Sequence, residues 1–113
     1  MTGSNFAGSN ITGLNIFSGD WSYVNLRNAS FKNHKLENIS FERADLSESN
    51  FDSAKLSNVN FSYSILNKCS FVNSDLREAN LANVPIKNII MKNTKVNLET
   101  AIMISEDYGA ICL

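Results

Sequence analysis

The sequence predicts a chain that coils regularly and turns every five residues, and three observations support this. A large apolar residue recurs at every fifth position, nineteen times in succession, from Phe6 to Val96. The residue two positions before each of these centres is usually small or β-branched, and the residue two positions after is Gly or Asn in ten of the nineteen repeats. A period of five fits neither the 3.6 residues of a helical turn nor the two-residue period of a strand. The chain must therefore turn regularly and direct one large apolar side chain inward per turn.

Each position of the five-residue unit has its own expected role. The centre fills the core, and the small residue two before it marks a second inward position with limited room. Gly or Asn two after the centre indicates a turn residue with positive φ. The other positions are mostly polar and are expected to face water. The centres are Phe6, Ile11, Ile16, Trp21, Leu26, Phe31, Leu36, Phe41, Leu46, Phe51, Leu56, Phe61, Leu66, Phe71, Leu76, Leu81, Ile86, Met91 and Val96.

Individual units point to a known family. Ala44-Asp45-Leu46-Ser47-Glu48 and Ala79-Asn80-Leu81-Ala82-Asn83 resemble the A(D/N)LXX unit of the pentapeptide-repeat proteins, and the resemblance runs from about residue 4 to 100. It implies an all-β fold, a right-handed quadrilateral parallel β-helix of nearly five coils in which four pentapeptides form one 20-residue coil. We therefore expect a β-helix over residues 1–100 and a C-terminal cap or dimerisation segment over residues 101–113.

Both ends of this rod are expected to be special, because a terminal coil has a neighbour on one side only. At the N-terminus the repeat begins at Ser4, so that end pairs with another subunit, continues into a longer protein or frays. At the C-terminus the apolar runs 101–105 and 109–113 predict a strand pair or a loop that closes the last coil, or else a subunit interface. A cap is the simpler and preferred interpretation, and the resemblance adds a subunit interface as the alternative, because the family often dimerises end to end through its C-terminal segment. The candidate dimer-interface residues are Ile102, Met103, Ile104, Tyr108, Ile111 and Leu113.

Residues twenty apart should stack in columns on the outside of the coil. Arg43 falls between Tyr23 and Tyr63, which allows cation–π stacking and suits a binding surface, although simple ladder packing would produce the same column. Lys35, Lys55, Asp75 and Lys95 form another column, either a solvated surface or an anion site. Near the C-terminus, apolar side chains occupy positions that are polar elsewhere, which indicates surface covered by the tail or by a partner. These further candidate protein-binding residues are Ile65, Val72, Pro85 and Ile90.

Composition and motifs argue against several classes of function. Ten basic and eleven acidic residues give a net charge of −1, so no global field attracts nucleic acid or an acidic membrane. No transmembrane run and no signal peptide are evident, which predicts a cytoplasmic chain, and Cys69 and Cys112 are expected to be reduced thiols. His34 falls at an inward position beneath Leu14 and is expected to pack in the core. We expect no catalytic, cofactor or metal site, and no enzyme.

The sequence thus favours a non-catalytic protein-interaction or scaffold module, because a filled rod lacks a cavity but offers regularly spaced sides to a protein partner. The partner is unknown, and a homodimer through one rod end, the C-terminal one favoured, is expected. The resemblance also raises a second hypothesis, a DNA-mimic regulator of a type II topoisomerase such as gyrase. A third is the repeat module of a larger secreted bacterial effector.

Overall fold

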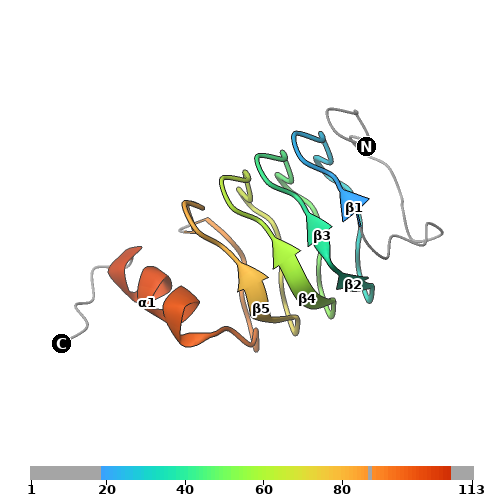
Figure 1. Ribbon diagram of the computed structural model, residues 1–113. Coiled ribbons are helices and arrows are strands. Elements are labelled where there is room, and N and C mark those ends of the chain that lie inside the picture. Colours follow the sequence, from blue (N-terminus) through green and yellow to red (C-terminus); the bar gives the residue numbers. More distant parts are fainter. Residues whose placement is uncertain (1–18, 87, 108–113) are drawn as a thin grey trace.

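The computed structural model describes residues 19–86 and 88–107. Short parallel strands stack along one axis, followed by a single helix, as Figure 1 shows. The sheet has the order β1-β3-β4-β2, and β5 pairs with β4. The centres Phe6, Ile11 and Ile16 lie outside the described residues. The elements are β1 (Gly19–Asp20), β2 (Lys35–Glu37), β3 (Ile39–Ser40), β4 (Lys55–Asn60), β5 (Asp75–Asn80) and α1 (Leu98–Asp107).

Strand pairing repeats every twenty residues. Lys35 pairs with Lys55 in parallel register, and isolated bridges link Asn25 with Asp45 and Asp45 with Ile65 on another side of the coil. A repeat of twenty residues with a corner every five gives a coil with four sides. The expected fold class, a right-handed quadrilateral parallel β-helix, is confirmed.

Most corners are tight turns. The backbone N–H of the residue three after a centre donates to the carbonyl of that centre, as Ala29 does to Leu26 (3.1 Å), and the residue two after the centre has positive φ. This is the geometry of a type II turn. The expected turn position is confirmed at Asn28, Asn33 and most of its equivalents. The corner at Leu36 differs, since no such hydrogen bond closes it and the chain runs on as strand.

Before many of the centres, a polar side chain fixes the turn that follows. The Oδ1 atom of Asn25 accepts a hydrogen bond from the backbone N–H of Arg27 (3.1 Å), and Asn50 does the same for Asp52 (2.8 Å). Asn and Asp favour this local bond. It explains why Asn, Asp or Ser so often precedes a centre in this sequence.

Aromatic rings fill the core from opposite corners of the coil. Phe31, Phe51 and Phe71 stack with centroids 4.6 and 5.1 Å apart, and Phe41 stacks on Phe61 at 5.6 Å. The two stacks meet edge to face, an arrangement that aromatic quadrupoles favour. Every centre from Leu26 to Leu81 is buried, as the sequence predicts. Trp21, Met91 and Val96, towards the ends of the described coils, are partly buried against this core.

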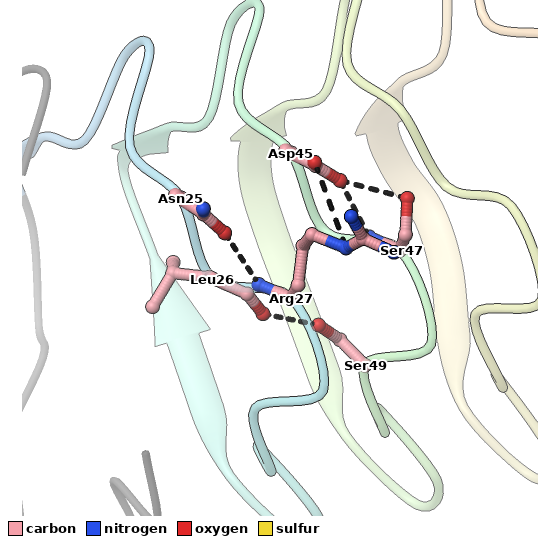
Figure 2. A network of polar contacts seen from close by, with 6 residues as sticks. All are labelled: Asn25, Leu26, Arg27, Asp45, Ser47 and Ser49. Carbon is pink, nitrogen blue, oxygen red and sulfur yellow. Dashed lines mark hydrogen bonds and ion pairs between the residues drawn. The ribbon is translucent and has the colours of Figure 1, made fainter. Parts of the chain in front are cut away.

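The second inward position is mostly buried, and hydroxyl groups of Ser49 and Thr94 at this position bond to the backbone of the preceding coil. Ser49 Oγ donates to the carbonyl of Leu26 in the preceding coil at 2.6 Å (Figure 2). On the outside of the same coil, the Asp45 carboxylate accepts a hydrogen bond from Ser47 Oγ (2.7 Å), and its Oδ2 atom lies 3.9 Å from Arg27 Nε. Hydroxyl groups at this position therefore link one coil to the next.

A helix, rather than a strand pair or loop, follows the last coil over residues 98–107. Asn97 Oδ1 accepts from the backbone N–H of Thr100 (2.8 Å), which is an N-cap, and Asn97 Nδ2 donates to the carbonyl of Arg77 (3.0 Å). Met103 and Ile104 pack against the core cluster. The apolar run thus covers core residues through one helical face, which its strand-like composition does not reveal.

His34 is only partly buried, which corrects the expectation of a packed core histidine. Its ring stands edge-on to Phe31 with centroids 6.2 Å apart, and Nδ1 lies 3.2 Å from the carbonyl oxygen of Lys32. The same column carries Ala54 and Ser74, so the inward slot is too small for an imidazole. Leu14, its expected neighbour, lies outside the described residues.

Candidate interaction surface

The first candidate surface is one side of the coil, which we call the aromatic side. Tyr23 is 60% exposed and Tyr63 is 49% exposed. Between them, the guanidinium carbon of Arg43 lies 4.5 Å from the ring centroid of Tyr63, and Arg43 Nε lies 3.8 Å from a carboxylate oxygen of Glu42. The cation–π contact allowed by the sequence therefore forms with Tyr63. By the aromatic side we mean the turn at one corner of the coil together with the residues that follow it, 21–25, 41–45, 61–65 and 81–85.

These three side chains occupy strained backbone positions. The φ angles of Tyr23, Arg43 and Tyr63 are 62°, 58° and 58°, in the left-handed region. A bulky residue there costs about 1–2 kcal/mol relative to the ordinary conformation, whereas Asn tolerates it better. Seven of the thirteen non-glycine residues with positive φ in the described chain are Asn. Three bulky residues in consecutive coils therefore depart from what the fold prefers.

Apolar side chains extend the aromatic side towards the C-terminus. Ile65 is 50% exposed and stands two residues after Tyr63 on the same side of the coil, and Pro85 is exposed one coil further on. Ile65 and Pro85 line a shallow hollow of about 110 Å³. Ile90, also 50% exposed, lies on the adjacent side, and the half-buried Val72 lies on the opposite side. The structure thus brings Tyr63, Ile65 and Pro85 onto one side but separates Val72 and Ile90 from them.

The opposite side, which we call the lysine side, gathers half of the ten basic residues of the chain. Its lysines form two columns that contain one aspartate each, because positions twenty apart stack. Counting the sequence in steps of twenty finds both columns, but the Lys35 column alone contains only three of the five lysines. The lysine side is the turn at the opposite corner of the coil together with the residues that follow it, 31–35, 51–55, 71–75 and 91–95, and its lysines are Lys32, Lys35, Lys55, Lys92 and Lys95.

Both aspartates on the lysine side are held by neighbours. The Arg77 side chain donates to both carboxylate oxygens of Asp75 at 3.0 and 2.9 Å, and this contact lowers the pKa of Asp75 to about 2. Asp52 accepts from the backbone N–H of Val72 (3.0 Å) and from the Ser70 hydroxyl. Neither carboxylate lies within 4 Å of a lysine ammonium group of this side in the described chain, although Lys95 helps to lower the pKa of Asp75.

The C-terminal candidates divide between core and surface. Met103 and Ile104 are partly buried against the core, and Ile102 is half-buried on the same helix. Leu98, in the first turn of α1, is 77% exposed. Tyr108, Ile111 and Leu113 lie outside the described residues.

Sites with other chemistry were also sought in the described part of the chain. Within residues 19–86 and 88–107, no group of three His, Cys, Asp or Glu side chains is arranged to hold a metal ion. Burial raises the pKa of the Cys69 thiol, so it is a poor nucleophile. Among the same residues, α1 is the only helix, and it is too short to cross a bilayer.

Comparison with known proteins found similar solved structures and one matching family model. The solved structures of similar fold include a pentapeptide repeat protein from the Arabidopsis thaliana thylakoid lumen, with 20% identity and a TM-score of 0.47, covering 93% of this chain and 73% of that one. They also include QnrB1, a plasmid-mediated fluoroquinolone resistance protein (20% identity, TM-score 0.46, 98% of this chain and 57% of that one). HetL, involved in heterocyst differentiation regulation in the cyanobacterium Nostoc, has 18% identity and a TM-score of 0.46, with 83% of this chain and 54% of that one covered.

The present chain thus spans little more than half the length of QnrB1 and of HetL. No curated protein matches it significantly. The family model described as pentapeptide repeats matches residues 25–62 and 54–93 with eight copies, which is more than half of the 113 residues. Together with the twenty-residue register and the four-sided coil, this match shows that the chain belongs to the pentapeptide repeat family.

Proposed function

We propose that the chain is a non-catalytic protein-interaction or scaffold module and that the aromatic side binds a protein partner. The observation that carries the proposal is the column Tyr23, Arg43 and Tyr63, half-exposed or more at left-handed positions. Backbone strain held at exposed positions is a reason to look for function. Tyr and Arg are also the residues that most often dominate the binding energy of protein interfaces. The adjacent Ile65 and Pro85 add apolar area beside these Tyr and Arg side chains.

The filled interior supports a role that depends on the outer sides. The phenylalanine stacks occupy the axis of the coil, and the small inward positions are buried as well. A substrate would therefore have to be bound on a flat or shallow surface, whereas most small-molecule sites are concave and enclose their ligand. Recognition of another protein suits such a surface better.

The test separates binding from folding with one pair of variants. Tyr63→Asn removes the aromatic ring and places a preferred residue at a left-handed position. Lys68→Asn makes the same backbone change on the adjacent side, where Lys68 has φ 60°. Neither variant should be less stable than the wild type by more than about 1 kcal/mol, because the cation–π contact that Tyr63→Asn removes is worth about that much. Stability is measured by urea unfolding.

Binding is measured by capturing proteins on the immobilised chain and quantifying them by mass spectrometry. We expect a partner retained by the wild type and by Lys68→Asn to be lost with Tyr63→Asn. If Tyr63→Asn is clearly destabilised and retains the same proteins as the wild type, the column is a packing ladder and the proposal fails.

We also propose a cytoplasmic homodimer joined through the C-terminal end. Leu98 is exposed at the start of α1, and Ile102 follows one helical turn later on the same helix. A second copy of this end would bury both side chains in a twofold contact. Light scattering of the wild type should give twice the mass of the chain, and Leu98→Glu should give a monomer. A monomeric wild type at high concentration would refute the dimer.

A further inference from the structure

The lysine side is positively charged, whereas the whole chain has a small negative net charge. Five lysines and two aspartates share this one side, although the chain as a whole has a net charge of −1. Lys32, Lys55, Lys92 and Lys95 are exposed and make no ion pair within 4 Å of a described residue, while Lys35 Nζ lies 3.2 Å from Glu37. The remainder of the chain is correspondingly acidic. The lysine side therefore carries a net charge of +3 (five lysines less two aspartates), and the rest of the chain −4 (−1 less +3).

The lysines are arranged in two pairs. Lys32 and Lys35 lie in one coil, and Lys92 and Lys95 lie three coils further along. With about 4.8 Å between coils, the two pairs are about 14 Å apart along the rod. Lys55 lies one coil from the first pair, in the same column as Lys35.

Between the two lysine columns runs a third column of small polar residues. These residues are exposed, have positive φ and carry amide or hydroxyl groups that can hydrogen-bond to a peptide backbone. A chain lying along this middle column would have a lysine column on each side. The middle column consists of Asn33, Ser53, Asn73 and Asn93.

We propose that the lysine side binds an extended acidic polypeptide segment that runs along the rod over the middle column. Successive side chains of an extended strand point to opposite sides, so two adjacent acidic residues would reach the two lysines of one pair. At about 3.3 Å per residue, about four residues separate the two lysine pairs. The matching ligand has two acidic pairs whose centres are about four residues apart.

The two aspartates favour a polypeptide over nucleic acid. Asp52 and Asp75 lie in the lysine columns at the middle of the rod, where Asp52 is bonded to Ser70 and Val72, and Asp75 to Arg77. A DNA duplex carries a charge about every 1.7 Å of its axis and would hold phosphates against both carboxylates. An acidic peptide can instead place neutral residues over the two middle coils, which carry Asp52 and Asp75.

The experiment measures fluorescence anisotropy of labelled peptides on the intact chain at low salt. The probe is Glu-Glu-Ser-Gly-Glu-Glu, and the spacing control is Glu-Glu-Glu-Glu-Ser-Gly, which has the same composition. We expect the probe to bind more tightly than the control. The double variant Lys92→Gln and Lys95→Gln should weaken probe binding about tenfold, because two exposed ion pairs are lost.

Lys68→Gln is the matched variant, because Lys68 is an exposed lysine on the adjacent side. It should leave probe binding unchanged, and circular dichroism should show that both variants keep the fold. Equal weakening by Lys68→Gln, equal binding of the two peptides, or tighter binding of a labelled DNA duplex or of phosphatidylserine vesicles would overturn the proposal. Tyr63→Asn should not affect probe binding, so the lysine side and the aromatic side succeed or fail separately.

Discussion

Truncation of Phe51 at the middle of the rod should destabilise the fold strongly. Its ring is fully buried, stacked on Phe31 at 4.6 Å and on Phe71 at 5.1 Å, and edge-on to Phe41 and Phe61. Phe→Ala changes in cores cost about 3–5 kcal/mol, and each aromatic pair adds about 0.5–1.5 kcal/mol beyond area burial. The backbone ladders on all four sides hinder collapse into the void. We therefore expect Phe51→Ala to lower the free energy of unfolding by about 5 kcal/mol.

The measurement is urea unfolding followed by circular dichroism and by Trp21 fluorescence, with the free energy extrapolated to water. Coincident transitions would show that the coils unfold as one unit. The matched control is Phe51→Leu, which keeps most of the volume and should cost only about 1–2 kcal/mol. A loss below about 2 kcal/mol for Phe51→Ala would refute the argument, because it would mean that the coils can close over the missing ring.

Four further predictions concern single groups and the topoisomerase hypothesis. Ser49→Ala should lower the free energy of unfolding by about 1 kcal/mol in urea, because it loses a hydrogen bond between coils. Ser64→Ala should be neutral or stabilising, because Ser64 Oγ is buried without a partner in the described chain. A larger loss for Ser64→Ala than for Ser49→Ala would contradict this reasoning. Arg77→Gln should raise the pKa of Asp75 from about 2 towards its usual value in an NMR titration. Because that pKa is depressed, the stabilisation is present above the usual aspartate pKa and is lost as pH falls towards 2. The pair is exposed, so this contribution is small, and an unchanged titration would exclude Arg77 as the cause. Cys69 should react with a thiol reagent far more slowly in the native chain than in urea, as mass spectrometry of its peptide would show, and equal rates would argue against its burial. In a supercoiling assay the chain should neither inhibit nor protect gyrase at micromolar concentration, and a dose-dependent effect would favour the DNA-mimic hypothesis over ours.

Much of the coil follows directly from the sequence. The spacing of Leu26, Phe31 and their equivalents predicts their burial, because only a turn every five residues brings all of them to one axis. Asn28 and its equivalents predict the positive φ, because Asn is among the few residues that tolerate it. Tyr23 and Arg43 show the limit of that signal, since the fold imposes the same φ on residues that disfavour it.

The C-terminal helix and His34 depended on tertiary context. The apolar run 101–105 contains two isoleucines and is compatible with a strand, so its composition does not decide its structure. Capping by Asn97 and packing of Met103 against the core favour the helix instead. For His34, the period identifies the column that it shares with Ala54 and Ser74, but whether its ring can be buried there depends on how closely the neighbouring coils pack.

The register of twenty residues has a consequence for how such a chain can change in length. Removal of twenty residues would leave every later side chain on its original side of the coil. Removal of five would also preserve the buried centres, yet it would rotate all later residues by a quarter turn and carry Lys92 and Lys95 to the side adjacent to Lys32 and Lys35. Gain or loss of a single repeat can therefore change which side chains of the later coils line up with those of the earlier coils on the outer surface, while the core stays intact.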